Sequence, residues 1–189
     1  MSAQPKHLFT EEQYLEIERK AETKSEFYNG EMFAMAGASF GHNRLVWNLI
    51  GLISRQLKPP CVGCPSDLRV RINSTGLYTY PDVVVTCGEL QFTDDHLDTL
   101  LNPSLVFEVL SPSTEAYDRG KKFDHYASIP SLNTYVLVSS DRVHVDVYVR
   151  QPDNNWLRTS AGKLDLTLPL RSIDCQLPLS ELYSGVEFD

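Results

Sequence analysis

The sequence of 189 residues has no long hydrophobic run. A membrane-spanning helix needs about 20 consecutive apolar residues, and no segment approaches that length. The first residues, Met1 to Lys6, do not combine a positive charge with a following apolar stretch, so they lack the pattern of a secretory signal. We therefore expect a cytoplasmic protein without a membrane segment. At this length we expect one domain, residues 1–189, that buries a sizeable core.

Positive charge is also scarce. The chain has 17 Lys and Arg residues against 25 Asp and Glu residues, and its net charge is −8. Proteins that bind nucleic acid broadly and without specificity are expected to be basic, so the composition counts against that class. It does not exclude a nuclease, because a metal site needs clustered carboxylates and a local basic patch can coexist with an acidic remainder.

Cysteine is rare as well, with four residues at positions 61, 64, 87 and 175. Cys61 and Cys64 have the spacing of a zinc half-site. A structural zinc ion usually takes two such pairs, and the sequence has no second pair. We therefore favour reduced thiols, as in most cytosolic proteins, over a zinc site.

The patterning predicts both helices and strands. A capping box at Thr10–Gln13 opens a helix to about Ala21, a second helix runs from Ser39 to Pro59, and a third covers roughly residues 115–128. Strands are predicted at residues 27–34, 68–72, 80–86, 105–110, 134–138 and 143–149, with a hairpin returning through 156–159. The order indicates an α+β (α/β) fold with one mixed central sheet, flanking helices and an added antiparallel hairpin.

Glu108 is the residue that a purely structural reading explains least well. It lies in the apolar run Leu105–Leu110, where alternation turns it to the same side as Val106 and Leu110. A buried, unpaired carboxylate costs several kcal/mol or becomes protonated, so some cation must face it. A metal ion, a lysine and an arginine all remain open, and a structural ion pair is as plausible as a functional one.

Two further residues are candidates for the same site as Glu108. Asp82 follows Pro81 at the start of an apolar strand, which lets its side chain project from the strand end. Lys122 shares a helix face with Asp118 and Tyr126 at four-residue spacing. Lys122 either forms a solvated pair with Asp118 or leans over the sheet edge towards Glu108.

The order of these residues resembles the PD-(D/E)xK nuclease superfamily, in the version whose lysine has moved from the strand to the following helix. The match is closer to the Uma-type bacterial family of restriction-endonuclease-like proteins. It rests on Pro81-Asp82, on the segment Glu108-Val-Leu-Ser-Pro-Ser-Thr114, and on the spacing of Asp118, Lys122 and Tyr126. The resemblance covers about residues 8–185 and implies a restriction-endonuclease-like core.

The resemblance also implies site residues. Asp82, Glu108 and Lys122 become the catalytic centre, and Asp82, Glu108 and the Val109 carbonyl become ligands of Mg²⁺ or Mn²⁺. Possible accessory residues are Glu26, His42, Asp67 and Tyr126.

The implied activity is metal-dependent hydrolysis of DNA. Candidates for contacts to the DNA backbone are Arg69, Arg71, Arg119 and Lys121. A homodimer is expected, because cutting two strands usually takes two centres. One alternative is an inactive nuclease-fold protein that binds nucleic acid or protein. A glycosidase with paired carboxylates is much less favoured, because nothing in the sequence calls for a sugar-binding groove.

Overall fold

A computed structural model describes residues 8–188 of the chain. Its helices and strands form a mixed α+β fold, as the sequence predicts. The N-terminal part contains α1 (Glu11–Glu18), β1 (Ser25–Tyr28), β2 (Glu31–Ala34) and α2 (Phe40–Ser54). The capping box is present, because the Thr10 side chain accepts from the Gln13 amide and the Gln13 side chain accepts from the Thr10 amide. Ser39 is the N-cap of α2.

The strands are divided between two large sheets. The five-stranded sheet has the order β2-β1-β5-β4-β7 and the six-stranded sheet the order β11-β10-β9-β8-β6-β3. Their remaining members are β3 (Cys61–Pro65), β4 (Arg69–Ile72), β5 (Leu77–Thr79), β6 (Val83–Cys87), β7 (Thr99–Leu100), β8 (Leu105–Leu110), β9 (Thr134–Ser139), β10 (Val145–Arg150) and β11 (Trp156–Ala161). The six-stranded sheet is mixed, since β8 and β9 are parallel and its other pairs antiparallel. The added hairpin is β10–β11.

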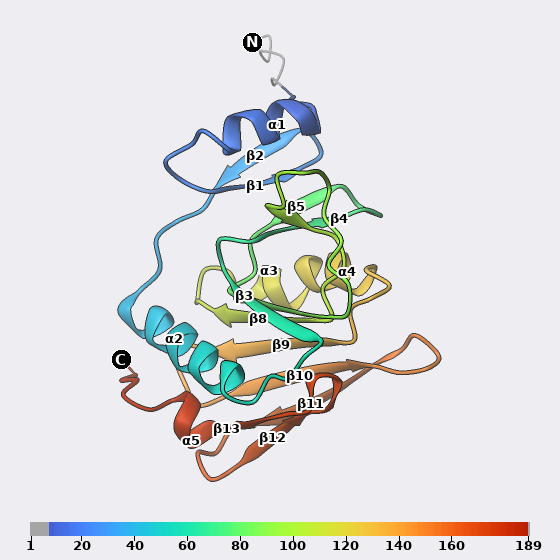
Figure 1. The fold of residues 1–189 in the computed structure, drawn as a ribbon. Helices are drawn as coiled ribbons and strands as arrows, with labels where there is room; N and C mark the ends of the chain where they lie inside the picture. The colour runs from blue at the N-terminus through green and yellow to red at the C-terminus, as the bar shows by residue number, and fades with distance from the viewer. Residues whose placement is uncertain (1–7, 189) are drawn as a thin grey trace.

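Helices cover both faces of the six-stranded sheet (Figure 1). On one face α2 packs with the C-terminal segment, which comprises β12 (Thr167–Leu170), a 3₁₀ turn (Arg171–Ile173), β13 (Cys175–Pro178) and α5 (Leu179–Leu182). On the other face lie α3 (Glu115–Arg119) and α4 (Lys121–Ala127), together with the inner face of the five-stranded sheet. A third apolar cluster joins α1 to β1 and β5. Glu108 therefore lies in a layer enclosed between sheet and helix.

The structure adds two features that the patterning did not reveal. The third helix is interrupted at Gly120, which separates α3 from α4. The edge strand β3 pairs antiparallel with β6 and sets Cys61 opposite Cys87, and these two residues form a disulfide. The expectation of reduced thiols is therefore wrong for this pair, because their proximity depends on a strand that was not predicted. Cys64 and Cys175 are free.

No helix between residues 8 and 188 is long and apolar enough to cross a lipid bilayer.

Candidate active site

Glu108 is held in the centre of the six-stranded sheet. It lies in β8, between β6 and β9, and only 5% of its surface is exposed. Its Oε1 atom lies 2.8 Å from Lys122 Nζ and accepts a hydrogen bond of 3.0 Å from the Tyr126 hydroxyl. The cation that the sequence required is thus Lys122 in the present structure, and the lysine leans over the sheet rather than into solvent.

One face of α3 and α4 supplies the rest of this layer. Asp118, Lys122 and Tyr126 are all buried, in the register that their spacing predicted, although Gly120 interrupts the helix. Asp118 Oδ1 lies 3.5 Å from Lys122 Nζ. The Asp118 carbonyl accepts a hydrogen bond from Tyr135 in β9, which fixes the helix over the sheet. A solvated Asp118–Lys122 pair was one of two alternatives, and the burial of Asp118 excludes it and adds Asp118 to the expected site residues.

Glu26 approaches the same lysine from the five-stranded sheet. Its Oε1 atom lies 3.7 Å from Lys122 Nζ and also accepts a short hydrogen bond from the Thr79 hydroxyl in β5. Glu26 is in β1, and its side chain is 16% exposed. Elements distant in the sequence therefore bring three carboxylates, those of Glu26, Glu108 and Asp118, around one ammonium group.

The charges in this cluster do not balance. Burial raises the pKa of Glu108 to about 8, although Lys122 opposes the shift, and the pKa of Asp118 is also raised by burial. Burial alone would lower the pKa of Lys122, but the carboxylates of Glu108, Glu26 and Asp118 raise it well above its usual value. Lys122 therefore keeps its proton, and the acids around it have too little positive charge nearby for all of them to ionise readily.

Asp82 lies at the edge of this layer, one residue before β6. Val83 is the partner of Phe107, so the next pair of the ladder sets Asp82 opposite Glu108. Asp82 Oδ2 accepts a hydrogen bond of 2.7 Å from the Val109 amide. Because the N–H and C=O of a strand residue point to the same edge, the Val109 carbonyl faces the side of Asp82 as well.

His42 joins Asp82 from the first turn of α2. Its Nε2 atom lies 3.4 Å from Asp82 Oδ2. Its other ring nitrogen, Nδ1, is buried and has no hydrogen-bond partner in the described part of the chain. Three of the four accessory candidates, Glu26, His42 and Tyr126, thus lie at the site.

The fourth candidate, Asp67, does not. Its side chain is 90% exposed and pairs with Lys24 at 3.0 Å. No contact in the described chain links Asp67 to Glu108 or Asp82. The acid ahead of β4 is therefore a surface residue, because the turn before the strand directs it outward.

The four expected phosphate contacts also divide. Arg69 is 3% exposed and pairs with Asp98 at 3.0 Å, so the fold has removed it from the surface. Arg71 pairs with Glu11, and Arg119 pairs with Asp146 and Glu115. Lys121 is exposed. Sequence position alone suggested cations near the site, but three of the four are bonded to acids of the protein itself.

Tyr117 in α3 is a further neighbour that the sequence did not identify. Burial raises its pKa to about 12, and the negative charges of Glu26, Asp118 and Glu108 add to that rise while Lys122 opposes it. No signal in the sequence distinguished Tyr117 from the other tyrosines. Its phenol is thus a weakly acidic group within electrostatic reach of the whole cluster.

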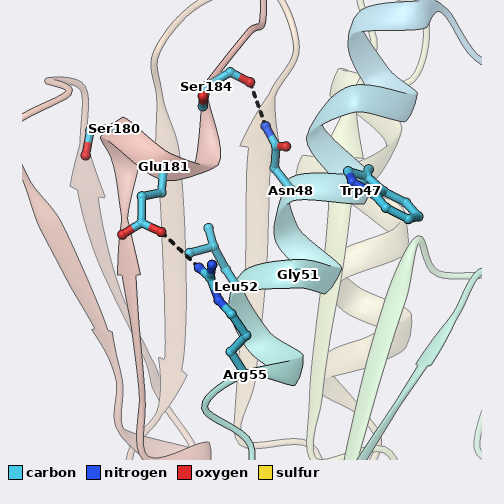
Figure 2. A pocket seen from close by; sticks show the side chains of 8 residues that line it. All are labelled: Trp47, Asn48, Gly51, Leu52, Arg55, Ser180, Glu181 and Ser184. Atoms are coloured by element: carbon cyan, nitrogen blue, oxygen red, sulfur yellow. Dashed lines mark hydrogen bonds and ion pairs between the residues drawn. The ribbon is translucent and has the colours of Figure 1, made fainter.

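A surface hollow of about 360 Å³ lies elsewhere, between α2 and the C-terminal segment. Its lining includes Trp47 and Asn48, and an ion pair of 2.9 Å between Arg55 and Glu181 closes one side (Figure 2). None of its eight lining residues belongs to the expected site. The ionisable groups expected at the site therefore gather in the buried acid cluster and not in this hollow.

Known proteins agree with this architecture. A family model described as "Uma2: Putative restriction endonuclease" matches residues 11–180. Two uncharacterized proteins of Synechocystis sp. are similar. One is 40% identical over 178 residues, 94% of this chain and 92% of that protein, and the other is 39% identical over 153 residues, 80% and 86% respectively.

A solved structure from Anabaena variabilis, described as a "putative nuclease belonging to DUF820", shares the fold. Its TM-score is 0.73 at 19% identity, and the match covers 93% of this chain and 98% of that one. At this identity the likeness concerns the fold alone, and it confirms the mixed α+β fold expected from the sequence. The chain is a member of the Uma2 family.

Proposed function

We propose that the protein is a metal-dependent endonuclease that hydrolyses phosphodiester bonds in DNA. The observation that carries the proposal is the acid cluster at β8, where buried Glu108 meets Lys122 while Asp82 is bonded to the next residue of the strand. Family membership and the nuclease fold support the same reaction class.

The donors at this site suit a hard divalent cation. Asp82, Glu108 and the Val109 carbonyl offer oxygen ligands of the kind that Mg²⁺ and Mn²⁺ prefer. The excess of carboxyl groups over ammonium groups is a second reason. A bound cation would neutralise the negative charge of these acids that Lys122 alone does not neutralise. Between residues 8 and 188 no three acidic, histidine or cysteine side chains are already arranged as a ligand set. Asp82 and Glu108 would hold the ion, and Glu26 could help to hold a second one.

The residues of the chain have distinct roles in this mechanism. A bound cation would polarise the scissile phosphate and lower the pKa of a water molecule. Lys122, being protonated, cannot accept a proton. It can donate hydrogen bonds to that water or to a phosphate oxygen and neutralise charge in the transition state. Tyr126 and Asp118 hold Lys122 and Glu108 in place, and the Val109 amide holds Asp82.

Substrate contacts and assembly extend the proposal. Exposed Lys121 is the remaining free candidate for a phosphate contact, which adds affinity rather than sequence choice. We propose a homodimer as well, since two centres can cut both strands of a duplex.

A second candidate function is a non-catalytic protein that keeps the nuclease fold for binding. The net charge of −8 favours this non-catalytic alternative over a nuclease, because an acidic surface repels a DNA substrate. Loss of divalent-metal binding in Glu108→Ala would argue against this alternative.

Plasmid cleavage tests the proposed reaction. Wild-type protein with Mg²⁺ or Mn²⁺ is compared with Asp82→Ala and with Asp67→Ala, a matched control that removes an exposed acid outside the cluster. We expect nicking by the wild type and the control and none by Asp82→Ala. Equal nicking by all three proteins would contradict the proposal.

A further inference from the structure

A row of three side chains leads from the acid cluster to the surface. Thr79 in β5 is buried, Glu26 in β1 is 16% exposed and Phe33 in β2 is 48% exposed. Glu26 and Phe33 are direct partners in the β1–β2 ladder, and the Thr79 hydroxyl donates to Glu26. Directly opposed residues of an antiparallel pair project to the same face, so Phe33 stands beside the acid that contacts Lys122.

The opposite face of the hairpin fixes this orientation. Phe27 and Met32 are also ladder partners, and they pack with Tyr14 of α1. Because side chains alternate along a strand, Glu26 and Phe33 point away from α1 and towards the acid cluster. Strand β2 is the edge of its sheet, and the chain leaves it directly for α2 (Figure 1). Phe33 is therefore an aromatic ring at the outer end of the row.

The charge distribution leaves few free cations near the site, so an aromatic ring such as Phe33 would be a useful source of affinity for a nucleic acid. Arg69, Arg71 and Arg119 are bonded to acids of the protein, and the chain carries a net charge of −8. Most of the cations expected near the site are therefore unavailable for phosphate contacts, which weakens that source of affinity. Stacking of a base on an aromatic ring needs no positive charge and is a common source of affinity for single strands.

We infer that Phe33 stacks on an unpaired base beside the scissile phosphate, so that the substrate is DNA with a single-stranded stretch. The inference rests on the proposed nuclease function for the position of that phosphate. Within an intact duplex both faces of a base are already stacked, so an exposed ring has no free base face to meet. Phe33 would thus select single-stranded or locally unpaired DNA over a continuous duplex.

Fluorescence anisotropy tests this with a labelled single-stranded oligonucleotide and the same sequence as a duplex, in Ca²⁺ to limit hydrolysis. The variants are Phe33→Leu, which keeps an apolar side chain without a ring, and Phe33→Tyr, which keeps the ring. Trp47→Ala is the matched control, since it removes a 70% exposed aromatic that lines the separate hollow beside α2.

We expect the wild type to prefer the single strand and Phe33→Leu to lose about tenfold of that affinity, in line with the usual strength of base stacking. Phe33→Tyr and Trp47→Ala should bind like the wild type. Unchanged affinity in Phe33→Leu, or an equal or stronger preference for the duplex in the wild type, would overturn the inference. The assay measures binding alone, so its failure would remove this inference and leave the nuclease proposal, which plasmid cleavage tests, standing.

Discussion

Two buried acids lie in one row of the six-stranded sheet and meet opposite surroundings. Glu108 in β8 and Asp146 in β10 are both opposite Leu137 of β9, so they share a face of the sheet. Asp146 is completely buried, as Glu108 nearly is. Arg119, Arg158 and Ser160 all donate hydrogen bonds to Asp146, whereas Glu108 has the Tyr126 hydroxyl and one lysine that two other acids share.

The pKa values express this difference. Burial would raise the pKa of Asp146, but the hydrogen bonds from Ser160, Arg119 and Arg158 lower it to about 2. The pKa of Glu108 is raised to about 8. A buried acid whose charge is fully met by cations and hydrogen-bond donors stabilises the fold. A buried acid with too few such partners would be stabilised by binding a further cation. Under the proposed function, Asp146 is therefore the structural carboxylate of this row and Glu108 the one that binds the metal ion.

The largest expected effect is on activity. Glu108→Gln and Asp146→Asn make the same chemical change, from carboxylate to amide. We expect Glu108→Gln to lower the rate of metal-dependent plasmid nicking at least about 100-fold, the usual scale for losing one transition-state contact. Asp146→Asn should cleave at a near wild-type rate below its unfolding temperature. A reversed order of the two rates would contradict the assignment of Glu108.

Stability should show the opposite order. Asp146→Asn leaves Arg119 and Arg158 facing an uncharged group, and we expect a loss of roughly 3 kcal/mol in the free energy of unfolding. Glu108→Gln leaves Lys122 with Glu26 and Asp118, and burial already disfavours the charged form of Glu108, so without metal we expect a smaller loss than in Asp146→Asn. Urea unfolding monitored by circular dichroism measures both. Equal losses in the two variants would show that the acids have the same structural role.

Acid should erase the stabilisation that Asp146 provides. Its folded pKa of about 2 lies below its ordinary value of 3.8, so its contribution is present above pH 3.8 and is lost as the pH falls towards 2. The stability difference between wild type and Asp146→Asn should therefore narrow over this interval. Unfolding measured at several pH values tests this, and acids common to both proteins cancel in the difference. A constant difference would contradict the low pKa.

The smallest effect concerns the two adjacent lysines. Lys121 is exposed and Lys122 is buried in the cluster. We expect Lys121→Ala to weaken DNA binding a few-fold and to reduce its salt dependence by about one ion, with the cleavage rate at saturation unchanged. Binding titrations at several salt concentrations measure this. A loss of turnover in Lys121→Ala would show that Lys121, and not Lys122, is the lysine that acts at the site.

Much of the site was predictable because it depends on local patterns. An acid on an apolar strand needs a cation, and this rule alone selects Glu108 from the sequence. Four-residue spacing on a helix placed Lys122 and Tyr126 on one face, and the structure confirms that register. The fold class followed from the order of the elements.

The remaining features depend on contacts between distant segments. Asp146 alternates with valines in a strand, a pattern typical of a solvent-facing side chain, yet Arg119 and Arg158 cover it. The same contact takes Arg119 away from the role expected for it. The Cys61–Cys87 disulfide required strand β3, whose short Gly- and Cys-containing segment carries little β signal.

Binding of Mn²⁺ measured by titration calorimetry tests the central claim most directly, because it needs neither substrate nor turnover. The proteins are the wild type, Glu108→Gln and Asp146→Asn. We predict that the wild type and Asp146→Asn bind the ion alike and that Glu108→Gln binds it at least about tenfold more weakly. Equal affinity in Glu108→Gln and the wild type would contradict the claim that the under-compensated acid of β8 is a metal ligand.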